Sequence, residues 1–85
     1  MAYKSFVDVI VLTTREGSKK PLRIRFENDE VYKIDRVIQI KRCAARKVGG
    51  TGIRYTVSIC GKQTYLFEDE GMWFVEAKEQ EMKVN

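Results

Sequence analysis

The chain has 85 residues, of which 44% are hydrophobic and 33% charged, and it carries a formal net charge of +4 with no histidine. The length and composition favour one small globular domain over a disordered chain. The absence of histidine means that the chain lacks the commonest general base and the commonest zinc ligand. No apolar run is longer than four residues, as in Val9 to Leu12, which excludes a transmembrane helix. The opening residues MAYK lack the apolar segment of a secretory signal, so we expect a cytoplasmic protein that contacts no membrane.

The first half of the chain alternates apolar and polar residues with the period of β-strands. Residues 5–14, SFVDVIVLTT, form the first expected strand, and a polar loop, REGSKK, follows. Pro21 opens the second strand, PLRIRFE, where its missing N–H is tolerated, and residues 27–29 make a turn. The long stretch 31–47 comes next, and its alternation slips near Asp35. A bulge or bend there would let one long strand serve two sides of a barrel.

The second half of the chain predicts three further strands, IRYTVSI, TYLFE and MWFVEA, with a turn before each. A glycine cluster precedes the first of these strands, and the turn Gly61-Lys62 precedes the second. A three-residue turn, Asp69-Glu70-Gly71, precedes the third. These turns place aromatic side chains on both faces of the expected sheet: Tyr65, Phe67, Trp73 and Val75 on one face, and Leu66, Phe74 and Val57 on the other. Such a sheet is either covered on both sides or contacts a partner.

Six strands with short turns and no internal helix predict an all-β fold. We expect a single small antiparallel β-barrel or rolled sheet of five to six strands, SH3-like in size, over residues 1–76, because closure removes exposed strand edges. Residues 77–85 contain helix formers but little to bury. They are expected to be a C-terminal tail, either a short helix or a frayed end.

Positive charge is concentrated in the middle of the chain. Residues 1–62 hold fourteen Lys and Arg against six Asp and Glu, whereas residues 63–85 hold two against six. No acid lies between Asp35 and Glu68, and the stretch KRCAARKVGGTGIRY, residues 41–55, gathers five basic side chains around glycines. We therefore expect an anion-binding region whose contacts are Lys41, Arg42, Arg46, Lys47, Gly49, Gly50, Gly52, Arg54 and Tyr55.

Each residue type in this region has a defined role in the hypothesis. The cations would contact phosphates, Tyr55 would stack on a base, and the glycines would let the backbone approach closely. The alternation of a strand puts Lys41 and Arg42 on opposite faces, however, so the charges do not all point one way. A solvated outer face and a bulged turn are the simpler interpretations of the cations and the glycines.

Several other sites are excluded by their sequence context. A phosphate-binding loop or a dinucleotide fingerprint needs a helix after its last glycine, but a strand follows Gly52. The acids at 68–70 sit in an expected turn and form no pair for acid–base chemistry. Cys43 and Cys60 are expected to be free, semi-buried thiols rather than a disulfide. We therefore expect no enzymatic activity, no metal and no cofactor.

Three segments, PLRIRFENDEVYKIDRV, RCAARKVGGTGIRYTVSICG and TYLFEDEGMWFVE, together resemble a family of small all-β proteins of clostridial and related Gram-positive bacteria. The resemblance covers about residues 21–76. The chain departs from the family at Asn28-Asp29-Glu30, where a glycine-containing turn is common, and this puts the type of that turn in question. The resemblance implies a recurrent domain with no known activity and at most an accessory role near DNA.

We expect the chain to be a non-enzymatic binding module that contacts nucleic acid, or another anionic partner, through the basic region 41–54. Counterion release would make such binding strongly dependent on salt. The alternative is a protein–protein adaptor or a homodimer without a nucleic-acid role. It would use an exposed apolar face of the last meander or of the first strand.

Overall fold

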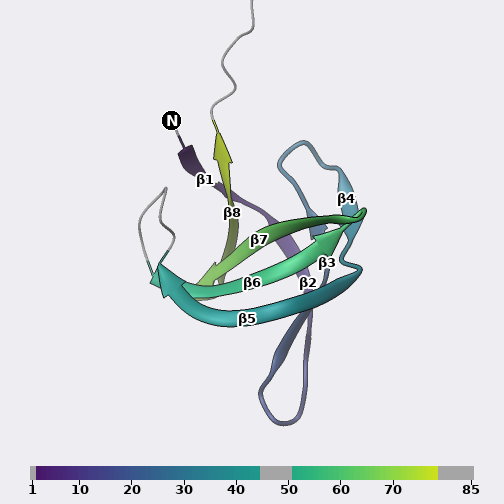
Figure 1. The fold of residues 1–85 in the computed structure, drawn as a ribbon, viewed down its shortest axis with the longest axis vertical. Helices are drawn as coiled ribbons and strands as arrows, with labels where there is room; N and C mark the ends of the chain where they lie inside the picture. Colours follow the sequence, from purple (N-terminus) through teal and green to yellow (C-terminus); the bar gives the residue numbers. More distant parts are fainter. Residues whose placement is uncertain (1, 45–50, 79–85) are drawn as a thin grey trace, which may run out of the picture.

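The computed structural model of the protein describes residues 2–44 and 51–78, and these residues form eight β-strands and no helix. One antiparallel sheet contains β1 (Ala2–Phe6), β5 (Arg36–Ala44), β6 (Thr51–Ile59), β7 (Lys62–Asp69) and β8 (Met72–Lys78). A second contains β2 (Asp8–Thr13), β3 (Lys19–Arg25) and β4 (Val31–Lys33). The strand orders are β1-β8-β7-β6-β5 and β2-β3-β4 (Figure 1). The predicted all-β class is therefore confirmed.

Two long segments of the chain contribute to both sheets. Residues 2–13 pair with β8 through β1 and with β3 through β2, and only Val7 separates the two strands. Residues 31–44 pair with β3 through β4 and with β6 through β5, and the change occurs at Ile34 and Asp35. These two divisions explain why eight strands are present where six were predicted. The bend expected near Asp35 is confirmed.

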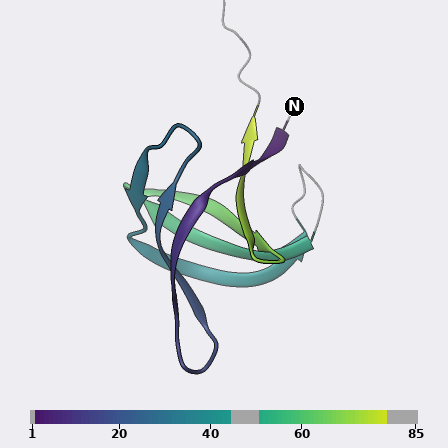
Figure 2. The same cartoon turned by 180° about the vertical axis from the view of Figure 1, so that it is seen from behind.

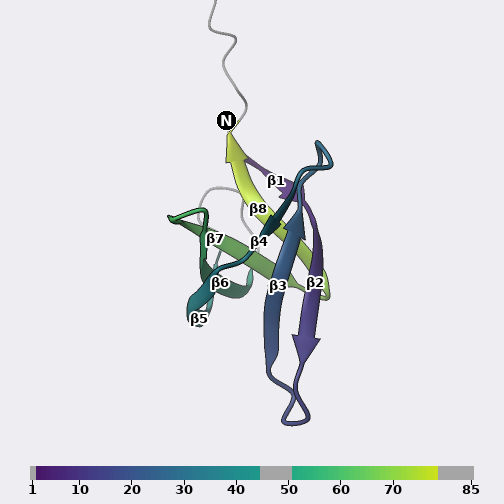
Figure 3. The same cartoon turned by 90° about the vertical axis from the view of Figure 1, so that its right-hand side faces the viewer.

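The hydrogen-bond ladders stop at both divisions, so the two sheets are not closed into a barrel. Single backbone hydrogen bonds cross the divisions. The Val7 N–H donates to the Trp73 carbonyl at 3.0 Å, and the Asp35 N–H donates to the Ser58 carbonyl at 2.8 Å. The β2–β3 hairpin stands across the long strands of the five-stranded sheet, as the back view and the side view show (Figure 2 and Figure 3).

The last two hairpins turn through two residues each. Cys60 and Gly61 connect β6 to β7, Glu70 and Gly71 connect β7 to β8, and all four residues have φ between 51° and 81°. Positive φ at both central positions is typical of a type I′ turn, whose twist matches that of the flanking strands. The prediction placed the first turn one residue too late and made the second one residue too long.

The shorter second turn reverses the side-chain directions predicted for β8. Phe67 lies directly opposite Phe74, and Glu68 lies opposite Trp73. Because opposed residues of an antiparallel pair share a face, Phe74 joins Phe67 on one face. Trp73 packs with Leu66 on the other, against the second sheet. The predicted grouping of Trp73 with Phe67 was wrong, since a slip of one residue moves every side chain of a strand to the opposite face.

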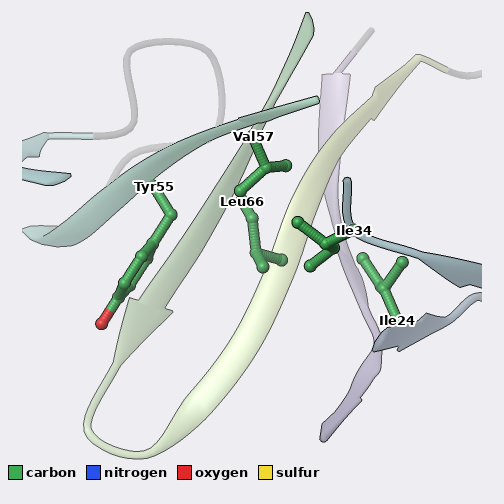
Figure 4. Packing of buried hydrophobic residues seen from close by; sticks show 5 residues of the cluster. All are labelled: Ile24, Ile34, Tyr55, Val57 and Leu66. Atoms are coloured by element: carbon green, nitrogen blue, oxygen red, sulfur yellow. The ribbon is translucent and has the colours of Figure 1, made fainter. Parts of the chain in front are cut away.

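The core lies between the two sheets, where five buried side chains share one space (Figure 4). They are Ile24, Ile34, Tyr55, Val57 and Leu66. Partly buried apolar side chains, Trp73 among them, pack around this cluster. Full burial of an aliphatic side chain of this size stabilises a fold by about 1.5–3 kcal/mol, so the contact between the sheets depends on a small number of residues.

Two strand boundaries differ from the prediction. β3 begins at Lys19, so Pro21 is its third residue, close to the point where the ladder to β2 changes register, and proline is tolerated at such irregularities. β8 extends to Lys78, whose partner is Ala2, so it includes the first two residues of the expected tail. Residues 79–85 lie outside the described residues. Within residues 2–44 and 51–78, no helix is long and apolar enough to cross a membrane.

Candidate nucleic-acid interface

The face of the five-stranded sheet that points away from the core carries a row of cations and rings. Register pairing places Lys41, Arg54, Phe67, Phe74 and Phe6 side by side across all five strands. Directly opposed residues share a face, and their neighbours along β6 and β7 point into the core. We call this surface the outer face. It is defined by Lys4, Phe6, Lys41, Arg54, Tyr65, Phe67 and Phe74.

Arg54 lies over an exposed aromatic ring on the outer face. Its guanidinium carbon is 4.4 Å from the centroid of the Tyr65 ring, within the range of a cation–π contact. Tyr65 is 42% exposed. The Arg54 Nε is buried and has no hydrogen-bond partner among the described residues. The contact therefore places the guanidinium over a ring that solvent still reaches.

A second cation lies beside Arg54. Lys41 of β5 is its direct partner in the β5–β6 ladder, so two positive side chains face each other on neighbouring strands. Like charges directly opposite one another destabilise a sheet. In the described part of the chain, neither side chain forms an ion pair with a carboxylate. An anion bound between them would remove this repulsion.

Aromatic rings continue the outer face toward β1. Phe67 and Phe74 stack at a centroid distance of 5.3 Å and an interplanar angle of 14°. Phe6 meets Phe74 edge to face at 5.9 Å and is itself largely exposed. The Lys4 Nζ lies 4.9 Å from the centroid of the Phe74 ring. The outer face thus has a cation at each end, with Glu76 directly opposite Lys4, and rings between them. Of these rings Phe67 and Phe74 are buried, whereas Phe6 is exposed.

The site residues predicted from the sequence do not all lie on one face of the sheet. Lys41 and Arg54 share the outer face, whereas Arg42 is paired with Ile53 and projects from the opposite side of β5, as strand alternation predicts. Tyr55 also points away from the outer face. Arg46, Lys47, Gly49 and Gly50 lie outside the described residues, so their part in the expected anion-binding region stays a prediction.

Tyr55 is a core residue and not an exposed stacking platform. It is 2% exposed, and its ring packs against Trp73 at a centroid distance of 5.0 Å. Burial, and to a smaller extent the negative charge of Glu68, raises the pKa of its hydroxyl above the ordinary value. The stacking role expected for Tyr55 is therefore not available in this structure, whereas the Tyr65 ring is exposed on the outer face.

Gly52 has a packing role within the sheet. A Cβ atom built at this position would lie 2.4 Å from the carbonyl oxygen of Glu68 on β7. Only glycine allows the two backbones to approach this closely. The residue was predicted to let a ligand approach the backbone, but the group that approaches is another strand of the same sheet.

The remaining polar groups form no further site among the described residues. Glu68 is buried, and its Oε2 accepts hydrogen bonds from Lys19 Nζ at 3.3 Å and from the Gly71 N–H at 3.1 Å. Cys60 is a free thiol that is exposed rather than semi-buried. Residues 2–44 and 51–78 contain no cluster of three His, Cys, Asp or Glu side chains that could hold a metal.

Five members of the outer face were not among the predicted site residues: Lys4, Phe6, Tyr65, Phe67 and Phe74. Lys4 and Phe6 reach it only through the pairing of β1 with β8, which no local pattern reveals. Tyr65 was recognised as part of an aromatic face, and its register partner Thr56 lies two residues after Arg54, so strand alternation was the available signal.

Searches among protein-family models, curated proteins and solved structures found no match to the chain.

Proposed function

We propose that the protein is a non-enzymatic module that binds single-stranded nucleic acid on its outer face. Bases stack on Tyr65 and Phe6, and phosphates lie at Lys41, Arg54 and Lys4. The observation that carries this proposal is the exposed Tyr65 ring, which holds Arg54 at 4.4 Å while Lys41 lies directly opposite that arginine. Surfaces that bind single strands combine such rings with cations that follow the backbone.

The dimensions of the outer face fit a short strand. Lys41 on β5 and Lys4 on β1 are at opposite edges of a five-stranded sheet. Neighbouring strands lie about 4.8 Å apart, so the four intervals span about 19 Å. A few nucleotides cover this distance, which agrees with the ~4–16 nucleotides that small single-strand-binding domains occupy. A duplex would not offer its bases for stacking.

The proposal includes a barrel-like scaffold of SH3-like size. Residues 2–13 join β3 to β8, and residues 31–44 join β3 to β6, so the pairing of chain segments runs in a ring. Hydrogen exchange tests this scaffold through the Val7 and Asp35 amides, whose bonds cross the divisions. Exchange as slow as in β6 is expected, and exchange as fast as in the exposed turn at Arg15 and Glu16 would contradict a continuous scaffold.

The binding proposal is tested with a labelled oligothymidylate and a labelled duplex of equal length, titrated with protein at two salt concentrations. We expect the single strand to bind more tightly and its affinity to fall steeply with salt. Lys41→Glu should abolish this binding. Arg42→Glu is the matched control, because it makes the same charge change one residue later on the opposite side of β5. Equal loss in both variants, or no binding at low salt, would rule the proposal out.

A protein–protein adaptor or homodimer is the second candidate function. It is favoured by β2, which is the edge strand of its sheet and exposes Ile10 and Leu12. A free apolar edge is a common site of strand addition. Light scattering tests a homodimer directly: a mass of two chains that falls to one chain in Ile10→Lys would support this function over the first.

A further inference from the structure

A cleft opens where β3 and the chain after β4 separate. β4 pairs with residues 23–25 of β3, and the Ile34 N–H still donates to the Leu22 carbonyl at 2.9 Å. The next residue, Asp35, donates to Ser58 of the other sheet instead. Residues 19–21 and the start of β5 therefore diverge without a ladder between them. We call the space between them the inter-sheet cleft.

The inter-sheet cleft is large enough for a ligand. Lys19 and Lys20 line one side of it, residues 35–40 line the other, and its volume is about 630 Å³. A second space of about 270 Å³ shares Lys19 and Ile40 with it and reaches Tyr55 and Glu68 near the core. Ligand-binding pockets in proteins measure about 300–1,000 Å³, so the cleft falls in this range.

Three apolar residues, Val37, Ile38 and Ile40, line the β5 wall of the inter-sheet cleft. The β5–β6 ladder changes register between Val37 and Gln39, which leaves Ile38 as an extra residue in β5. Such bulges redirect side chains at sheet edges. Ile38 is 44% exposed and Ile40 is 53% exposed, and both line the cleft. Two large aliphatic side chains beside a free strand edge form a surface that favours contact with apolar side chains.

The charge of the inter-sheet cleft is positive at its mouth. Lys20 and Arg36 line it against a single acid, Asp35, and neither cation forms an ion pair among the described residues. Lys19 is different, because its ammonium contacts Glu68 at 3.3 Å. Arg42 projects from the same side of β5 as Ile40 and adds a further positive charge along the strand. The mouth is therefore complementary to carboxylates.

We infer that the inter-sheet cleft binds an extended peptide segment of a partner protein in which apolar and acidic residues alternate. The peptide lies along the free edge of β5, its apolar side chains contact Ile38 and Ile40, and its carboxylates approach Lys20 and Arg36. β5 is the edge strand of its sheet, so its outward backbone groups can extend the ladder. The β3 wall suits pairing less well, because Pro21 has no N–H to donate.

The cleft favours a peptide over a nucleic acid because it offers no exposed ring. The aromatic side chain that borders it is Tyr55, which is buried against Trp73. Bases need aromatic faces to stack on, whereas alternating side chains of an extended peptide match two isoleucines on one strand. The inference does not depend on the outer face, since Ile40 is paired with Tyr55 and points to the core side of β5, whereas Lys41 and Arg54 share the outer face.

The probe is a short fluorescein-labelled peptide of alternating glutamate and valine, titrated with the full chain and followed by fluorescence anisotropy. We expect saturable binding that Ile38→Glu and Lys20→Glu each weaken at least about tenfold. Ile10→Glu and Lys33→Glu are the matched controls, because both residues are exposed and lie outside the cleft. They should bind the peptide as the unmodified protein does.

Four results would overturn the inference. These are the absence of saturable binding, equal loss in the control variants, equal binding of a lysine–valine peptide, and displacement of the peptide by oligothymidylate. A dimer that dissociates in Ile38→Glu would also overturn it, because a second copy would then occupy the cleft. Lys41→Glu separates this test from the proposed function: it should abolish oligonucleotide binding and leave peptide binding unchanged.

Discussion

Arg54 and Tyr65 lie on neighbouring strands with the guanidinium carbon 4.4 Å from the ring centroid. The two residues are diagonal neighbours, because Arg54 is paired with Phe67 and Tyr65 with Thr56. Long and aromatic side chains reach one another across such diagonals. The contact is exposed on one side, so a planar ligand can add to the ring or to the guanidinium without disturbing the core.

Removal of the Tyr65 ring is expected to weaken single-strand binding. Stacking on an aromatic side chain contributes about 1–3 kcal/mol per base, so Tyr65→Ala should raise the Kd of oligothymidylate about 5- to 150-fold. Tyr3→Ala is the control, because Tyr3 is equally exposed but bonds to Glu27 on the other side of the sheet. Fluorescence anisotropy measures both affinities. An unchanged Kd in Tyr65→Ala would remove stacking from the mechanism.

Lys41 is expected to contribute one phosphate contact. Neutralising it in Lys41→Gln should reduce the slope of log K against log salt concentration by about 0.7, the value for one contact to a single strand. Arg42→Gln should leave the slope unchanged, since this side chain projects from the opposite side of β5. Titrations at several salt concentrations give both slopes, and equal slopes for the two variants would contradict the assignment.

Much of the fold could be predicted because the alternation of apolar residues is a local signal. It identified the all-β class and the interruption near Asp35. Which side chains of β8 face the core could not be predicted, because this depends on the turn before the strand. In that turn Glu70 adopts a positive φ, which is uncommon for a glutamate. One residue in the length of that turn decided which of Trp73 and Phe74 entered the core.

The candidate site was predicted in part for a similar reason. Lys41 and Arg54 are close in a single hairpin, so their shared face follows from β5–β6 pairing. Tyr55 was assigned with Arg54, although adjacent residues of a strand point to opposite faces, and that rule already argued against their joint action. The contribution of Phe6 required the pairing of β1 with β8, a long-range contact that local pattern does not encode.

Gly52→Ala is expected to destabilise the sheet. The added Cβ would meet the Glu68 carbonyl oxygen, a backbone atom that cannot move without displacing β7. Overpacking of this kind costs about 1–3 kcal/mol, which urea denaturation followed by circular dichroism measures. Gln63→Ala, an exposed change on β7, should alter the free energy of unfolding by less than about 0.5 kcal/mol. A Gly52→Ala protein of unchanged stability would show that β6 and β7 separate easily.

Alkaline pH is expected to destabilise the protein partly through Tyr55. Burial raises the pKa of its hydroxyl in the folded state, so the folded protein holds this proton more tightly than the unfolded chain does. The resulting stability is complete below about pH 10, the unfolded value, and is lost as pH rises from there through the folded pKa. Tyr55→Phe should lose less stability than the unmodified protein over this range. Urea denaturation at several pH values measures both proteins, and an equal loss of stability in Tyr55→Phe would contradict the prediction.

The pairing of Ala2 with Lys78 has a consequence for the order in which the protein forms. During synthesis β1 leaves the ribosome before the other described strands, and its partner β8 leaves after all of them. Until β8 appears, β1 cannot form its hydrogen-bond ladder, and the contact between the Phe6 and Phe74 rings cannot form. The β6–β7 hairpin, by contrast, forms from neighbouring residues. The pairing of β1 with β8 therefore cannot form until almost the whole described chain has been synthesised, and contacts of such large sequence separation form slowly.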